Sequence, residues 1–155
     1  MKRFIFLYFI VLSSCNQNQD KAEQPVEPLY DYDVEERLEE LNITLIPSPP
    51  PVANYVNAVK TGNLRCLAGK GPTLAEGGYI TGKVGVDLTI EEGYEAARRT
   101  AIVQLSVLKH ELGDLNKVVR IVKVLGMVNA DSSFTQHPEV INGFSDVMVE
   151  VFGDR

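Results

Sequence analysis

A glycine-rich stretch before the longest helical pattern of the sequence contains residue types that could bind phosphate. Gly77, Gly82 and Lys83 have the spacing of a phosphate-binding loop, in which backbone amides and a lysine hold phosphate groups. The motif then requires a hydroxyl for magnesium, but Val84 stands at that position and no helical pattern follows directly. This stretch therefore disfavours a nucleotide site.

The other reactive residue types are isolated from one another. His110 falls near the end of the long helical pattern and His137 precedes a proline, and neither has a cysteine or an acidic pair at metal-ligand spacing. Ser145 and Asp146 lie within a helical pattern, without the strand-to-helix turn that activates a serine nucleophile. Spacing alone therefore favours neither a metal site nor covalent catalysis.

The N-terminal residues have the pattern of a targeting sequence. A basic start is followed by the apolar run 4–12, which is too short to span a bilayer, and then by Leu-Ser-Ser-Cys at residues 12–15. This pattern resembles the lipobox of a bacterial lipoprotein, which implies cleavage before Cys15 and a lipid on its thiol. An ordinary signal peptide with an incidental cysteine is the alternative.

We therefore expect a signal peptide over residues 1–14, a flexible polar tether over residues 15–30 and the folded domain over residues 31–155. The lipid would anchor the chain in a bacterial cell envelope, because several acyl chains together hold a protein firmly to a membrane. Cys66 lies in an apolar run, and we expect it to be a small buried residue. With Cys15 lipidated, no intrachain disulfide can form.

The charge balance bears on possible partners. The formal net charge is −6, and no cluster of basic residues is present in the domain. Nucleic acids are bound through contacts between basic residues and phosphates, so this balance disfavours a nucleic acid as partner.

The element most clearly written in the sequence is a helix over residues 89–113. Thr89 and Glu92 form a capping box, and Gly113 supplies the left-handed residue that ends a helix. Its apolar stripe begins with small residues, Ala97 and Ala101 among them, so that this end of the helix can approach its support closely. We expect the support to be a sheet.

The remaining elements flank this helix. A short helix is plausible within residues 31–42, and two strands over residues 52–60 and 63–69 form a hairpin around Thr61 and Gly62. After the long helix we expect a strand over residues 115–129, apolar on both faces. It would be covered on both sides, either by helices and a second layer or by helices and a partner subunit. A second helix begins at Pro138 and ends at Gly153.

The predicted order is strand, strand, helix, strand, helix, which defines a compact α/β domain. A three-stranded sheet with two helices leaves the long apolar strand short of neighbours, and alternating strands and helices normally return to a strand. We therefore expect the chain to be a fragment or a truncated product.

Seven segments of the sequence together resemble a known protein family, which the spacing of single reactive residues does not identify. They are PPVANYVNAV (50–59), TGNL (61–64), AGKGP (68–72), GKVGVDLT (82–89), EEGYEAAR (91–98), VKVLGMVN (122–129) and VINGFSD (140–146). In collinear order, these segments look like the RidA/YjgF family, also labelled endoribonuclease L-PSP. The resemblance covers roughly residues 41–153 and fits best the branch of slightly longer proteins.

The resemblance implies a chorismate-mutase-like α/β (α+β) fold in which two helices pack on a sheet. The sheets of three subunits form the inner barrel of a homotrimer, and the helices lie outside. In active members, clefts between subunits hydrolyse 2-imino acids or their enamine tautomers to 2-keto acids and ammonia, without a cofactor. An arginine binds the substrate carboxylate, and backbone groups position a water.

The family's site residues can be placed on this sequence one by one. Its tyrosine matches Tyr55 and its asparagine matches Asn142, the two candidate catalytic residues. Its substrate-binding serine falls at Ala68, the glycine is kept as Gly69, and Lys70 replaces a glutamine. The carboxylate-binding arginine and a glutamate belong to strands that would follow the second helix, so the chain is expected to lack them. Structural roles for the tyrosine and the asparagine remain the alternative.

Two functions are therefore expected as alternatives. The first is an enamine/imine deaminase acting on a small 2-imino acid, lipid-anchored in the cell envelope. The second is a non-catalytic module of the same fold that binds a small acid or a protein. RNA cleavage is the weakest possibility, because the net charge opposes it and no general acid/base pair is visible.

Overall fold

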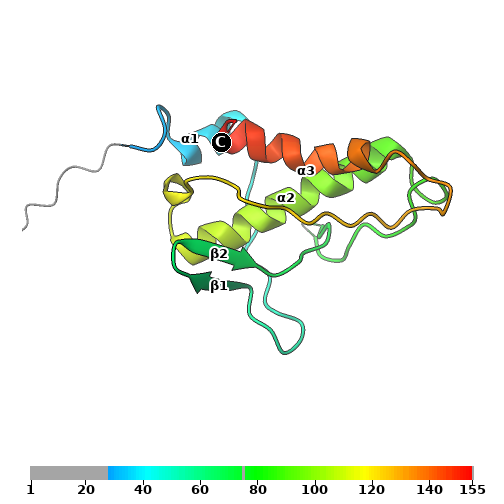
Figure 1. Ribbon diagram of the computed structural model, residues 1–155, viewed down its shortest axis with the longest axis horizontal. Helices are drawn as coiled ribbons and strands as arrows, with labels where there is room; N and C mark the ends of the chain where they lie inside the picture. Colours follow the sequence, from blue (N-terminus) through cyan, green and yellow to red (C-terminus); the bar gives the residue numbers. More distant parts are fainter. Residues whose placement is uncertain (1–27, 75, 155) are drawn as a thin grey trace, which may run out of the picture.

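The computed structural model describes residues 28–74 and 76–154 (Figure 1). The expected signal peptide, with its lipidation site Cys15, and nearly all of the expected tether lie outside the described residues. The elements in chain order are α1 (Val34–Glu40), β1 (Ala58–Thr61), β2 (Leu64–Leu67), α2 (Ile90–Leu112), the short 3-10 helix η1 (Leu115–Lys117) and α3 (His137–Phe152).

Helix α2 begins and ends where the sequence predicts. The Thr89 hydroxyl accepts from the Glu92 amide at 3.1 Å, and the Glu92 carboxylate accepts from the Thr89 amide at 2.8 Å, so both halves of the capping box form. At the other end Gly113 adopts φ 72°, a left-handed conformation that only glycine adopts without strain. Both boundaries are confirmed.

Helix α3 packs along α2 in the same direction (Figure 1). Tyr94 on α2 donates to Asp146 on α3 at 2.8 Å, and one turn further along both helices Arg98 pairs with Glu150 at 3.2 Å. The backbones touch at Gly143, where an added Cβ would lie 2.1 Å from the Tyr94 carbonyl oxygen. The close support of the small-residue end of α2 is therefore another helix, whereas the sequence predicts a sheet.

One hydrophobic core joins the three α-helices. Side chains from α2 and α3 form its centre, and residues before and within α1 close one end. The most deeply buried large side chains of the described residues are Phe152, Leu105, Leu115, Val34, Val103, Val107, Val147 and Val151, of which all but Val103 and Val107 belong to this core.

The hairpin forms as predicted, with shorter strands. β1 and β2 are antiparallel, and Val59 lies opposite Cys66 in their register. Successive side chains of a strand point to opposite faces. Leu67 turns toward the core, and Cys66 is therefore on the outward face, where its thiol is exposed. The expectation of a buried Cys66 is wrong for this reason.

The predicted strand over residues 115–129 is not present as a strand. It begins as η1 and continues as extended chain, and within the described part of the chain it has a ladder contact only at its far end, where Val84 bonds the Asn129 carbonyl at 2.9 Å. Leu125 and Met127 are 78% and 87% exposed. The prediction of a strand is therefore wrong for these residues, because a strand needs a hydrogen-bonded neighbour and, apart from that far end, the described residues supply none. Cover of its apolar faces by a partner subunit stays a prediction.

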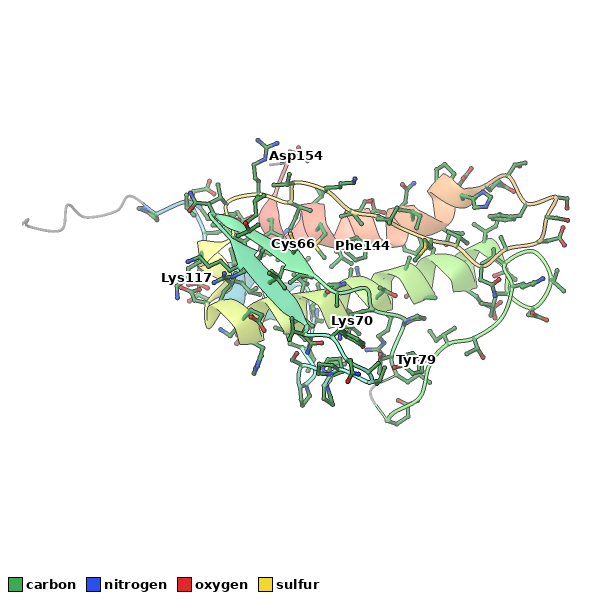
Figure 2. All side chains as sticks on the ribbon, turned by 60° about the horizontal axis from the view of Figure 1, so that its bottom comes forward. Cys66, Lys70, Tyr79, Lys117, Phe144 and Asp154 are labelled. Atoms are coloured by element: carbon green, nitrogen blue, oxygen red, sulfur yellow. The ribbon has the colours of Figure 1, made fainter. Side chains whose placement is uncertain are left out.

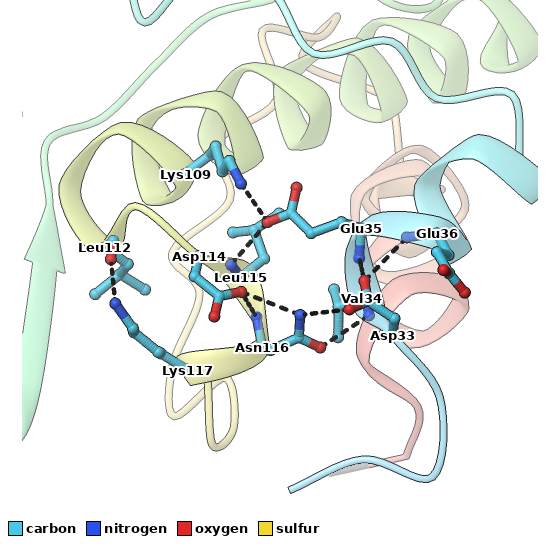
Figure 3. Close-up of polar contacts among 10 residues, drawn as sticks. All are labelled: Asp33, Val34, Glu35, Glu36, Lys109, Leu112, Asp114, Leu115, Asn116 and Lys117. Carbon is cyan, nitrogen blue, oxygen red and sulfur yellow. Dashed lines mark hydrogen bonds and ion pairs between the residues drawn. The ribbon is translucent and has the colours of Figure 1, made fainter. Parts of the chain in front are cut away.

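A polar cluster holds α1 against the end of α2 (Figure 3). The Asn116 side chain accepts from the Val34 amide at 2.9 Å and donates to Asp33 at 3.2 Å. Glu35 accepts from Lys109 at 2.6 Å and from the Leu115 amide at 3.0 Å. Through these bonds the N-terminal helix becomes part of the same compact unit as α2 and α3.

In residues 28–74 and 76–154, no helix has both the length and the apolar character needed to span a membrane.

Candidate functional site

The loops on either side of the hairpin bring Tyr55 and Lys70 together. The Lys70 ammonium lies 5.8 Å from the centre of the Tyr55 ring and donates to the Asn57 side-chain oxygen at 2.6 Å. Figure 2 shows Lys70 on the loop that follows β2, facing away from the side on which Phe144 of α3 lies. A cation above an aromatic face, with an amide oxygen beside it, is the most chemically distinctive cluster that we find in the described residues.

Asn57, the residue directly before β1, holds the Lys70 ammonium and the neighbouring loops together. Its backbone carbonyl accepts from the Ala68 amide at 2.9 Å, which extends the hairpin ladder by one bond. Its side-chain nitrogen donates to the Pro49 carbonyl at 2.7 Å, which ties the proline-rich segment to the same point. An asparagine beside a strand is common in sequences, so the role of Asn57 follows only from its hydrogen-bond partners in the structure.

Ala68 and Gly69 occupy the backbone between β2 and Lys70. The Ala68 carbonyl accepts from the Gln104 side chain of α2 at 3.0 Å, so this loop is held against the middle of the long helix. The space around Gly69 is open, since a Cβ there would meet no atom within 4 Å. The side-chain oxygen of Gln104 and the Nε of Arg65 are buried without a hydrogen-bond partner in the described structure.

The Tyr55 hydroxyl is accessible and has a proton to give. The residue is 40% exposed, and its oxygen accepts from the Val52 amide at 3.3 Å. Because that bond uses a lone pair of the phenol oxygen, the hydroxyl hydrogen remains free to donate to a ligand.

Asn142 lies elsewhere in the chain. The next residue, Gly143, touches the backbone of α2 at Tyr94, whereas Ala68 is bound to Gln104. Those two points on α2 are ten residues apart, which corresponds to about 15 Å along a helix axis. Figure 1 agrees, with the hairpin beside the C-terminal half of α2 and the start of α3 beside its N-terminal half. One chain therefore does not bring Tyr55 and Asn142 into one site.

The histidines take no part in a cluster. His110 and His137 are exposed, and the His137 ring packs edge-on against Phe134 with 5.1 Å between centres. Across the described residues, no group of three potential metal ligands occurs.

A shallow groove of about 290 Å³ lies between the extended segment and the C-terminal half of α3. Its lining is mostly apolar and consists of Ile121, Val124, Phe144, Ser145, Met148, Val149, Phe152, Gly153 and Asp154. It is separate from the Tyr55 and Lys70 cluster, and neither Leu125 nor Met127 lines it.

Fold and cluster together define an α+β domain with a hairpin, two parallel helices and a candidate small-molecule site at the hairpin loops. Residues 36–155 match the family described as "YjgF/chorismate mutase-like, putative endoribonuclease". The chain belongs to this YjgF/RidA-like family.

Relatives and solved structures agree with this assignment. Protein TCP17 of Trypanosoma cruzi is 40% identical over 118 residues, which are 76% of this chain and 74% of that protein. A structure from Shewanella oneidensis MR-1, described as a "putative endoribonuclease", has a TM-score of 0.76 and 29% identity, covering 79% of this chain and 82% of that one. Protein Atu1372 of Agrobacterium tumefaciens, of unknown function, has a TM-score of 0.70 and 36% identity, covering 78% and 74%.

Proposed function

We propose that this protein is an imine/enamine deaminase that hydrolyses a small 2-imino acid to a 2-keto acid and ammonia. The observation that carries the proposal is the exposed Tyr55 side chain, with its ring centre 5.8 Å from the Lys70 ammonium, at the positions where the family resemblance places its substrate site.

The reaction needs only proton transfer and a positioned water. Water adds to the carbon of the C=N bond while the nitrogen gains protons, and the resulting amino alcohol expels ammonia to leave the C=O of the keto acid. A phenol that accepts one hydrogen bond can donate its own proton toward the imine nitrogen. This chemistry requires no metal and no cofactor.

The proposal includes a homotrimer as the working form. Apolar side chains of residues 119–127 are exposed along the extended segment, and contiguous exposed apolar surface marks interaction sites. A neighbouring subunit would cover this segment and pair with its backbone. It would also offer its Asn142 to the Tyr55 cluster, which a single chain does not do.

The cellular location is also a proposal. A lipid on Cys15 would hold the domain to a bacterial envelope membrane through the tether. Mass spectrometry of the membrane fraction should find a diacylglycerol-modified Cys15 at a new N-terminus, and a protein recovered with residues 1–14 attached would contradict the anchor.

The activity is tested with an imine produced in place by an amino-acid oxidase, because free 2-imino acids hydrolyse in water. We expect the protein to accelerate keto-acid formation over the enzyme-free blank, with a trapping amine such as semicarbazide reporting the remaining imine. A rate equal to the blank across several 2-imino acids would sink the deaminase proposal.

The second candidate is a non-catalytic binding module. Ala68 favours it, because the family resemblance places a serine at this position and alanine has no hydroxyl to hold a substrate. This alternative predicts a thermal shift with 2-keto acids in the absence of any imine turnover. Cleavage of RNA, which the family description names, is opposed by the net charge of −6.

A further inference from the structure

Lys70 and Lys109 are the two half-buried lysines among the described residues, and they differ in their charge partners. Lys109 pairs with Glu35 at 2.6 Å, whereas no carboxylate among the described residues lies within ion-pair distance of Lys70. Its recorded partners are the Asn57 amide oxygen and the Tyr55 ring, both of which are neutral. A half-buried ammonium with neutral partners has an uncompensated positive charge.

The geometry leaves this charge available to a ligand. An ammonium has three donors, and one of them is used by Asn57. Asn57 is itself held by Pro49 and by the hairpin backbone, so the hydrogen bond from Lys70 to Asn57 directs the ammonium toward a positioned partner. The open space beside Gly69, the residue next to it, leaves room for a small molecule.

We propose that Lys70 is the specificity-determining residue that binds the carboxylate of the substrate. This inference rests on the proposed function for the identity of the substrate, a 2-imino acid with its 2-keto acid product. The carboxylate carbon and the imine carbon are adjacent in such a molecule. A carboxylate on the Lys70 ammonium would therefore hold the imine near Tyr55, whose ring centre lies 5.8 Å from that ammonium.

The chemistry makes a clear distinction among ligands. A carboxylate gains a charge-assisted hydrogen bond from Lys70, and the corresponding neutral amide does not. Because the site is partly exposed, added salt should weaken carboxylate binding and leave amide binding nearly unchanged.

The test compares Lys70→Gln with Lys60→Gln, which removes an exposed lysine on β1 and serves as the matched control. Isothermal titration with 2-oxobutyrate and with 2-oxobutanamide measures binding without any turnover. We expect Lys70→Gln to weaken 2-oxobutyrate binding by about 10- to 100-fold, the range for a hydrogen bond to a charged group. Amide binding should change less than about twofold, and Lys60→Gln should match the wild type in both titrations.

Two results would overturn the inference. One is 2-oxobutyrate binding by Lys70→Gln within about twofold of the wild type, in a variant whose thermal unfolding shows that it is folded. The other is a wild-type protein that binds 2-oxobutanamide as tightly as 2-oxobutyrate, or that binds neither ligand. In the kinetic assay, the loss of Lys70 should appear as a raised KM with a smaller change in kcat.

Carboxylate binding by Lys70 and the deaminase activity can be contradicted independently of each other. Imine turnover that is unaffected in Lys70→Gln contradicts the lysine's role and leaves the deaminase standing. If 2-oxobutyrate binding depends on Lys70 but no imine is turned over, the deaminase proposal is contradicted. Lys70 would then be the carboxylate site of a non-catalytic binding module.

Discussion

Tyr55 and Lys70 illustrate how much of a site depends on contacts that are distant in sequence. Their positions follow from the family resemblance, but the ring-to-ammonium contact and the role of Asn57 do not. Both depend on the hairpin register, which aligns the residues before β1 with those after β2. The sequence therefore identifies the residues, and the structure supplies the arrangement that gives them a chemical role.

Tyr94 carries a pH-dependent contribution to stability. Its hydroxyl donates to the Asp146 carboxylate, and this bond, together with the nearby negative charge, raises the tyrosine pKa above its ordinary value of 10.0. A group whose pKa is raised by folding stabilises the fold fully below its unfolded pKa. That contribution is lost as the pH rises through the folded pKa.

We expect the free energy of unfolding to fall above about pH 10 in the wild type, and to fall less steeply in Tyr94→Phe. Urea unfolding between pH 8 and 11 measures this difference. Tyr79→Phe is the control, because the Tyr79 ring is 56% exposed and its hydroxyl bonds no described residue. Parallel pH profiles for wild type and Tyr94→Phe would contradict the assignment.

At the scale of elements, the helix boundaries and the hairpin follow from local signals, whereas pairing between distant segments does not. The capping box, Gly113 and Pro138 each act within a turn or two of chain, so α2 and α3 could be placed from sequence. The 115–129 segment has the composition of a buried strand, but its pairing needs a neighbour that the described residues do not supply. The exposure of Cys66 likewise depends on which face of β2 meets the core.

The close contact between α2 and α3 requires a residue without a side chain at position 143, which is Gly143. In Gly143→Ala the new Cβ would lie 2.1 Å from the Tyr94 carbonyl oxygen, a backbone atom that cannot move without shifting the helix. We expect a loss of about 3 kcal/mol or more in the free energy of unfolding, at the upper end for overpacking.

Thermal and urea unfolding of Gly143→Ala measure this loss. Gly69→Ala is the matched control, because a Cβ at that position meets nothing within 4 Å. Equal stability of the two variants would show that the helices separate easily, contrary to the packing described.

At the scale of the whole molecule, the uncovered apolar segment is the feature that a single chain leaves unexplained. Val122 is 64% exposed and Leu125 is 78% exposed, and the apolar groove against α3 adjoins them. Exposed apolar area of this extent has a free-energy cost in water that a partner would remove. The proposed trimer would cover this face.

A charge in the segment should disrupt that assembly. We expect the wild type to have the mass of a trimer in light scattering and Leu125→Lys to shift toward the monomer, because burying an unpaired ammonium is costly. Val52→Lys is the control, since Val52 is 82% exposed and lies outside the segment. A monomeric wild type, or a Leu125→Lys trimer of unchanged stability, would contradict the proposed interface.

The central claim is that Tyr55 acts in the hydrolysis of a 2-imino acid, and one kinetic comparison tests it most directly. The rate of imine loss is measured for wild type, Tyr55→Phe and Tyr79→Phe with the imine generated in place. We expect a loss of about 100-fold or more in kcat for Tyr55→Phe, the size of effect for a proton donor, and no change for Tyr79→Phe. Imine hydrolysis by Tyr55→Phe at the wild-type rate would contradict it.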